Sequence, residues 1–326
     1  MADLGANDLR TALLGTRSPR EISDFIARHG ISRLLLEEPY VVGSRGDYLL
    51  QRIFHDASGD DAVARVALRR GEVVGLLVVR YPQWDREHFG YVVGRVEHLQ
   101  GADEEVLECL VDETVQQLHA RGARMCSARL SSDALAALHC LERSRFRLAE
   151  LTLAPWRNLS TWEPKGYGVT RPTRAEDVEH MCAIARKTFR TDRFHRDVRF
   201  DRTAADGVYD KWIRSWHAGP SSNQYSRVLI VEGAVAGFVM FEVVKSPSPD
   251  GEAITTLVLG GVDPSKSHRG YGTRLWCDVL DVSAGASRFV SATVSAANPT
   301  VVNMYAKLGF RLTSSGEVTM HWWSED

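Results

Sequence analysis

Apolar runs in the first half of the chain predict a sheet with helices packed against it. Residues 63–68 and 73–80 are rich in β-branched residues and are joined by a short turn with Gly71, which is typical of a β-hairpin. Apolar residues then recur at helical spacing over residues 107–118, and Gly122 is placed to end that helix. A strand at residues 124–130, a helix at 133–142 and a strand at 148–153 complete the predicted order.

The second half repeats this order of elements. Residues 228–231 and 235–244 predict another hairpin around Glu232-Gly233, and residues 254–262 predict the strand that follows it. The remaining predicted elements are helices at 175–189, 204–216, 273–281 and 299–308 and strands at 289–294 and 318–322. The chain is therefore predicted to be an α/β protein with mixed α+β sheets, in which one architecture is used twice.

The boundary between the two predicted domains lies in a stretch that contains several prolines. A chain of 326 residues is long for one hydrophobic core and suits two domains. Residues 154–172 contain three prolines and keep no steady apolar period, which is typical of a linker. We place the boundary near Ser160, so the expected domains are residues 1–160 and 161–326.

Composition and charge exclude several classes of protein. Forty Lys and Arg against 42 Asp and Glu give a formal net charge of −2, which provides no global field for nucleic acid or an anionic membrane. The five cysteines are odd in number and lack CxxC spacing, which argues against a disulfide framework and a zinc site. No apolar stretch approaches the roughly 18 residues of a membrane span, and residues 1–20 lack the apolar middle of a signal peptide. We expect a soluble cytoplasmic protein with no metal, nucleic-acid or membrane partner.

A glycine-containing turn between a strand and a helix is the first candidate for chemistry. The strand at residues 254–262 leads to Arg269-Gly270-Tyr271-Gly272-Thr273, which opens the next helix. Glycines let a backbone turn tightly and approach a ligand, and amides at a helix start favour phosphate oxygens. The turn therefore suits a pyrophosphate. The alternative is a simple glycine turn into a helix, since a lone GxG is a weak signal.

The run resembles the acetyl-CoA motif of the GNAT superfamily of N-acyltransferases, Arg/Gln-x-x-Gly-x-Gly/Ala. Arg269 and Gly272 match its first and fourth positions, and Arg274 departs from the small residue usual at the sixth. Asn298-Pro299, Met304-Tyr305 and Leu308-Gly309-Phe310 also resemble the family, in which the Asn helps to hold the pantetheine arm. The resemblance implies two tandem GNAT-like domains and acetyl-CoA, or another acyl-CoA, as cofactor. The implied cofactor-binding residues are Val262, Arg269, Gly270, Tyr271, Gly272, Thr273 and Asn298.

Transfer of an acyl group from a thioester to an amine needs a polarised carbonyl, a proton for the leaving thiolate and a base for the amine. In the family a backbone N–H polarises the carbonyl where two central strands splay, which here falls at residues 259–262. The resemblance makes Tyr305 the general acid; alternatively, it is a helix tyrosine that covers the core. Glu242 is the candidate base, although it could equally point outward from its strand. His321, in the last strand, carries the same ambiguity.

An arginine-rich segment occupies the stretch in which GNAT enzymes bind their acceptors, and it contains Arg186, Arg190, Arg193, Arg196, Arg199 and Arg202. Together with Trp84 and Phe89-Gly90, this segment resembles the bacterial dTDP-fucosamine acetyltransferases, which implies an amine on a nucleotide-linked deoxysugar as acceptor. Arginine forks suit a diphosphate or a carboxylate, whereas the alternative is a solvated face with internal ion pairs. The expected acceptor-binding residues are Arg193, His195 and Trp212.

The first domain lacks a counterpart of the glycine turn. Asp103-Glu104-Glu105 stands where its helix begins, and three acids would repel a pyrophosphate. Only the second domain is therefore expected to bind acyl-CoA, and the first is expected to be degenerate. The leading hypothesis is N-acylation of a small-molecule amine by a monomer or homodimer. The alternatives are a protein or peptide N-acetyltransferase and a catalytically silent acyl-CoA sensor.

Overall fold

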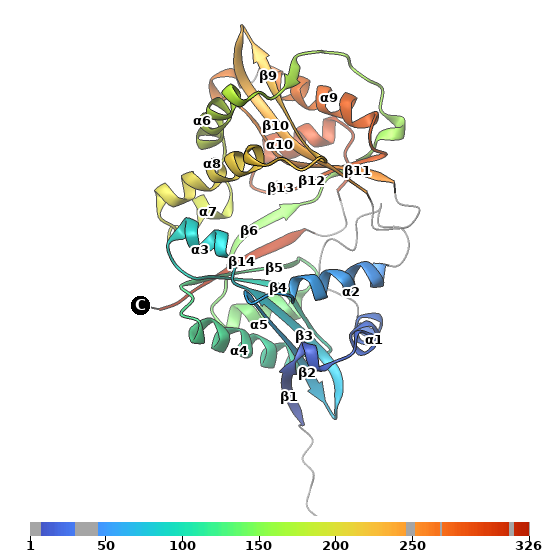
Figure 1. Cartoon of the computed structure of the whole chain (residues 1–326), viewed down its shortest axis with the longest axis vertical. Helices are drawn as coiled ribbons and strands as arrows, with labels where there is room; N and C mark the ends of the chain where they lie inside the picture. The colour runs from blue at the N-terminus through green and yellow to red at the C-terminus, as the bar shows by residue number, and fades with distance from the viewer. Residues whose placement is uncertain (1–7, 30–44, 246–251, 268, 313–315, 326) are drawn as a thin grey trace, which may run out of the picture. The chain divides into compact units, whose positions relative to one another are not determined.

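The computed structural model describes residues 8–29, 45–245, 252–267, 269–312 and 316–325. These residues form two compact units (Figure 1). The first unit contains the described residues up to Leu151 together with those from Gly316 onward, and the second runs from Thr152 to Leu312. Within the described residues, no helix is both long enough and apolar enough to cross a membrane.

The first unit is a sheet with helices on both faces. Strands β1 to β4 run antiparallel to one another in turn, as do β5 and β14, whereas β4 and β5 run parallel. Helices α1 (Pro19–His29) and α2 (Arg45–Asp56) cover one face, and α4 (Glu104–Ala120) and α5 (Leu135–Arg143) cover the other. In sheet order the strands are β1 (Leu9–Leu13), β2 (Ala62–Arg69), β3 (Glu72–Arg80), β4 (Val93–Gly101), β5 (Met125–Ser131), β14 (Glu317–Trp323) and β6 (Arg147–Leu153). The short helix α3 (Gln83–Phe89) connects β3 to β4.

The second unit is built in the same way. Helices α6 (Val178–Thr188) and α8 (Arg202–Ala218) cover one face of its sheet, and α9 (Tyr271–Ala284) and α10 (Pro299–Lys307) cover the other. In sheet order the strands are β7 (Trp156–Asn158), β12 (Phe289–Ala292), β11 (Ala253–Val262), β10 (Ala234–Lys245), β9 (Gln224–Val231) and β8 (Thr170–Pro172). The four-residue helix α7 (Arg193–Arg196) lies between α6 and α8 in the chain.

The observed elements confirm the predicted fold class, a mixed α/β architecture used twice. Both hairpins form, as β2–β3 and β9–β10, and β11 leads into α9. The partner of the last strand was not anticipated. β14 pairs with β5 of the first unit, from Glu317 opposite Ser131 to Trp323 opposite Met125. In the second unit, β12 pairs instead with β7, a strand that precedes it by more than a hundred residues.

Candidate active site in the second unit

The glycine turn ends a strand and starts a helix, as the sequence indicates. β11 ends at Val262, and Gly270 adopts the left-handed conformation with φ of 76°, which favours glycine. Helix α9 begins at the next residue, and Gly270 at the N-cap has no side chain that could cap it. The amide of Arg274 donates to the carbonyl of Gly270, so the amides of residues 271–273 have no acceptor within the helix. They are available to an anion.

The turn is also open enough to admit a phosphate. A Cβ at Gly272 would meet nothing closer than Sδ of Met304 at 3.8 Å, and Gly270 has open space around it. Arg269 and Thr273 are exposed. The side chain of Arg274, the departure from the family motif, stands over the rings of Tyr167 and Tyr271 at 5.9 and 6.0 Å. The residues present therefore fit a pyrophosphate, with amide donors and a nearby guanidinium.

The two central strands separate beside this turn. The parallel pairing of β11 with β12 covers Ile254 to Leu257 and ends there. On its other side β11 stays paired with β10 up to Val262, with a bulge between Met240 and Phe241. The edge of β11 that β12 leaves can bond another group, because each backbone residue carries its own donor and acceptor. This is the stretch in which we expected the strands to splay.

Close packing explains the two glycines in the separated stretch. A Cβ at Gly260 would lie 2.9 Å from Cη2 of Trp276, and one at Gly261 would lie 3.1 Å from Cγ2 of Thr188. Larger residues would push these side chains away from the strand. Trp276 on α9 therefore lies directly against the part of β11 that extends beyond its pairing with β12.

Tyr305 lies against the same tryptophan. It is on α10, is 5% exposed, and its Oη accepts a hydrogen bond of 3.2 Å from Nε1 of Trp276. Burial raises the pKa of Tyr305 to about 12, and the bond from Trp276 opposes that rise. The hydroxyl keeps its proton at neutral pH, and because its oxygen is the acceptor in this bond, that proton can be donated elsewhere.

Asn298 caps the helix that carries Tyr305. Its Oδ1 accepts from the amide of Val301 at 3.2 Å, and Pro299 follows at the first helical position. The side chain predicted to hold the pantetheine arm thus fixes the start of α10. Its amide nitrogen is not needed for this cap.

The two candidate bases lie in different units. Along β10, Phe238 and Met240 pack toward α6 and α8, so alternation places half-buried Glu242 on that same face. His321 is fully buried in β14, opposite Ser127, and belongs to the first unit. Of the two, Glu242 shares a unit with Tyr305.

The predicted acceptor residues differ in their surroundings. His195 has a side chain only 2% exposed, and its ring nitrogens contact Asp192 at 2.7 Å and Asp206 at 2.9 Å. Burial raises the pKa of Asp206, but the bond with His195 and nearby positive charge outweigh it and keep that pKa below its usual range. His195 therefore ties α7 to α8 and is not open to a ligand within this unit.

Arg193 and Trp212 lie on the two helices that His195 connects, α7 and α8. Trp212 is 38% exposed and stacks on Tyr209 with centroids 6.4 Å apart. The guanidinium of Arg193 stands 4.3 Å from the centroid of Phe194. Trp212 therefore offers a partly exposed indole on α8.

Several arginines of this segment are held by acids of the same unit. Arg186 pairs with Asp210, Arg190 with Asp206, and Arg199 with Asp197. The sequence is compatible with an anion-binding patch or with a face of internal ion pairs, and for these three arginines the internal ion pairs are observed. They do not present unpaired forks to a diphosphate.

One residue of the site was not singled out from the sequence, namely Trp276. It contacts both Tyr305 and the position of Gly260. The available signal was its place four residues after Gly272, one helical turn into α9, combined with the need of a buried indole N–H for an acceptor.

A helix start open to a pyrophosphate, a strand edge freed beside it and a buried phenol are features that an acyl-CoA-dependent N-acyltransferase needs. Residues 179–310, within the second unit, match the acetyltransferase (GNAT) family model, which supports an N-acetyltransferase enzyme. No curated protein sequence matches the chain.

Two solved structures show the same fold over nearly the whole chain. A tandem GNAT protein from the clavulanic acid biosynthesis pathway is 14% identical, with a TM-score of 0.58 over 98% of this chain and 100% of that one. A GCN5-related N-acetyltransferase from Sphaerobacter thermophilus is 13% identical, with a TM-score of 0.64 over 97% and 96% of the two chains. At these identities the likeness concerns the fold.

Proposed function

We propose that the second unit transfers an acetyl group from acetyl-CoA to the amine of a small molecule. The observation that carries the proposal is the contact between Trp276, Tyr305 and the freed end of β11 beside the turn at Gly270. Bound acyl-CoA would supply the activated acyl group. The amides of residues 271–273 and Arg269 would hold its pyrophosphate, and Val262 and Asn298 would contact its pantetheine arm.

Each chemical demand of the transfer has a residue in this unit. Tyr305 would donate the proton that the leaving thiol needs, because it is protonated at neutral pH and its oxygen is steadied by Trp276. A backbone N–H of the freed β11 edge would polarise the carbonyl. Glu242 would receive the proton of the amine, since it lies on the α6–α8 face.

The acceptor is the finer part of the proposal. Trp212 offers a partly exposed indole on α8, which suits an amine with an apolar or ring-shaped body. A nucleotide-linked amino sugar is one such acceptor, but the ion pairs of Arg186, Arg190 and Arg199 give its diphosphate less support than the sequence suggested. We therefore propose a small-molecule amine without specifying a nucleotide.

The test is release of free thiol from acetyl-CoA by the full chain across three groups of acceptors: small amines, amino sugars with and without a linked nucleotide, and peptides with a free amino terminus or lysine. The proposal expects turnover with a small amine and an acetylated product by mass spectrometry. Turnover confined to peptides would favour a protein N-acetyltransferase. Binding of acetyl-CoA with no thiol release above background would favour a sensor.

A further inference from the structure

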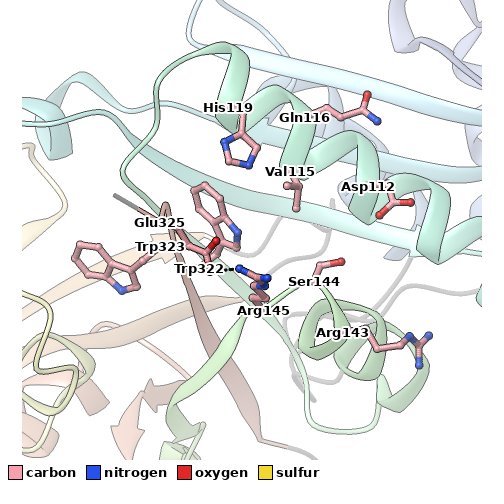
Figure 2. Close-up of a pocket in the computed structure, with 10 residues that line it drawn as sticks. All are labelled: Asp112, Val115, Gln116, His119, Arg143, Ser144, Arg145, Trp322, Trp323 and Glu325. Carbon is pink, nitrogen blue, oxygen red and sulfur yellow. Dashed lines mark hydrogen bonds and ion pairs between the residues drawn. The ribbon is translucent and has the colours of Figure 1, made fainter.

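The first unit contains a cavity that the proposed transfer reaction does not use. Its volume is about 590 Å³, within the range of small-molecule sites. Figure 2 shows that its walls come from one face of α4, from the turn that follows α5 and from the end of β14. The residues that matter here are Val115, His119, Ser144, Arg145, Trp322 and Glu325.

Arg145 holds a backbone conformation that side chains other than glycine rarely adopt. Its φ is 67°, and it follows the last turn of α5, where Arg145 N donates to Glu142 O and Phe146 N to Leu141 O. This pair of bonds is the Schellman ending of a helix, whose left-handed position is usually glycine. An arginine at that position carries backbone strain.

The second unit shows the same ending without that strain. At the end of α10, Gly309 N donates to Ala306 O and Phe310 N to Tyr305 O, and Gly309 has a φ of 73°. Among the residues that the structure describes, two other non-glycine residues have a positive φ, Arg70 and Glu232, and each precedes a glycine in a tight hairpin turn. Of these three described residues, Arg145 is the one whose side chain lines this cavity (Figure 2).

The guanidinium of Arg145 is held by a weak and replaceable partner. It pairs with Glu325, and their side chains are 65% and 79% exposed. Ion pairs this exposed contribute little to stability. Its neighbour Arg143, by contrast, is shared by Glu104 and Glu108. The ion pair of Arg145 with Glu325 can therefore be broken without disturbing a helix, whereas the acids that pair with Arg143 belong to α4.

We propose that this cavity binds a small molecule that carries one carboxylate and an apolar ring, with the ligand carboxylate replacing that of Glu325 on Arg145. The ring would lie by Val115, Trp322 and His119, where the imidazole meets the indole edge-on at 5.3 Å. A phosphate or a second carboxylate fits less well, because Asp112 also lines the cavity and the C-terminal ends of α4 and α5 carry partial negative charge.

The test measures binding of benzoate and indole-3-acetate to the full chain by calorimetry, with benzylamine and inorganic phosphate as comparison ligands. We expect both carboxylates to bind at millimolar concentration or below, and Glu325→Gln to tighten binding several-fold because it removes the competing acid. Arg145→Gly should weaken binding at least tenfold, while relief of strain raises the melting temperature by roughly 2 °C.

The matched control is Arg70→Gly, which relieves positive φ in the β2–β3 turn, away from the residues that line the cavity. It should leave carboxylate binding unchanged. The proposal is overturned if neither carboxylate binds, if benzylamine or phosphate binds as well as benzoate, or if Arg145→Gly stabilises the chain and binds benzoate as tightly as the unaltered protein.

Discussion

Helices α4 and α9 occupy corresponding places in the two units, yet their first turns carry opposite chemistry. In the first unit Asp103 caps α4 by accepting from Val106 N, and Arg69 bonds both Asp103 and Glu105. The bond from Arg69, together with the amide of Val106, keeps the pKa of Asp103 below its usual range. In the second unit the N-cap residue of α9 is Gly270, which has no side chain to cap the helix. At the start of α4 the carboxylate of Asp103 occupies the position where an anion could bind, whereas the start of α9 leaves that position open.

The cores of the units differ in the same direction. The buried positions of α4 and α9 follow one spacing, in which Leu107 stands where α9 has Trp276. Likewise, the carbonyl of Leu141 accepts the hydrogen bond that closes the end of α5, as the carbonyl of Tyr305 does at the end of α10. The hydrogen-bonded pair of the second unit is thus a pair of leucines in the first. The two units therefore share a fold but differ at the start of this helix and at two core positions, and these are the positions that the proposed reaction uses.

The largest expected effect is at the open helix start. Gly272→Glu would place a carboxylate among the amides of the first turn of α9 and imitate the first unit. Because like charges at a binding site cost several kcal/mol, the affinity for acetyl-CoA should fall by about 100-fold or more in calorimetry. The control is Gly285→Glu at the other end of α9, where a Cβ meets only ordinary contact at 3.6 Å. Equal affinities of the two variants for acetyl-CoA would show that the pyrophosphate does not bind at this turn.

The second effect is on turnover. Tyr305→Phe should lower kcat by about 100-fold or more, because a positioned proton donor contributes about that much. Its Kd for acetyl-CoA should change little, since the ring and its contact with Phe310 are kept. Tyr225→Phe, at an exposed tyrosine on β9, serves as the control. A Tyr305→Phe enzyme with an unchanged kcat would make this tyrosine a core residue, as Leu141 is.

Local patterns were sufficient to predict most elements but not their partners. Residues 63–80 and 228–244 give hairpins because both strands and the turn are adjacent in the chain. Residues 317–323 have the composition of a strand, yet nothing local specifies pairing with Met125–Ser131. Pairing over such a separation depends on register and on which sheet edge is open. The helix α3 was missed because seven residues are too few for a helical period to be recognised.

The candidate site was predictable to a similar degree. The glycine turn could be proposed from its place between a strand and a helix, whereas Tyr305 could be proposed only from the resemblance of its surrounding motif to the GNAT superfamily. The ion pairs of the acceptor segment were not assigned, although Arg186 and Arg190 are spaced by one helical turn, as are Asp206 and Asp210. Because the two arginines and the two aspartates have the same spacing, two helices that pack side by side could have been predicted to form both ion pairs. The bond between Trp276 and Tyr305 requires the fold itself, because the two residues lie on different helices.

A third prediction separates the units by stability at low pH. Asp56 is 4% exposed, and although burial raises its pKa, the bond with His98 and the charge of Arg52 lower it to about 2. The folded-state pKa is below the unfolded value of 3.8, so this stabilisation is present above pH 3.8 and is lost as pH falls toward 2. Asp56→Asn should cost the first unit on the order of 2 kcal/mol at pH 7 and little at pH 2. Urea unfolding at both pH values measures this. A cost that is the same at both would mean that the carboxylate's charge has no role.

The smallest expected effect on kcat is that of a change at Trp276, where the first unit has Leu107. Trp276→Phe keeps an aromatic ring near Gly260 but removes the N–H that bonds Oη of Tyr305. Because that bond lowers the pKa of Tyr305, its loss should raise the pKa further and make the phenol a poorer proton donor. Since a hydrogen bond to a group that develops charge is worth about 1.5 to 3 kcal/mol, kcat should fall by about tenfold, with Kd for acetyl-CoA nearly unchanged. The decisive control is the double variant with Tyr305→Phe. If Trp276 acts through the hydroxyl, it should lower kcat no further once that hydroxyl is gone, whereas a second tenfold loss would show that the indole acts on the strand edge at Gly260.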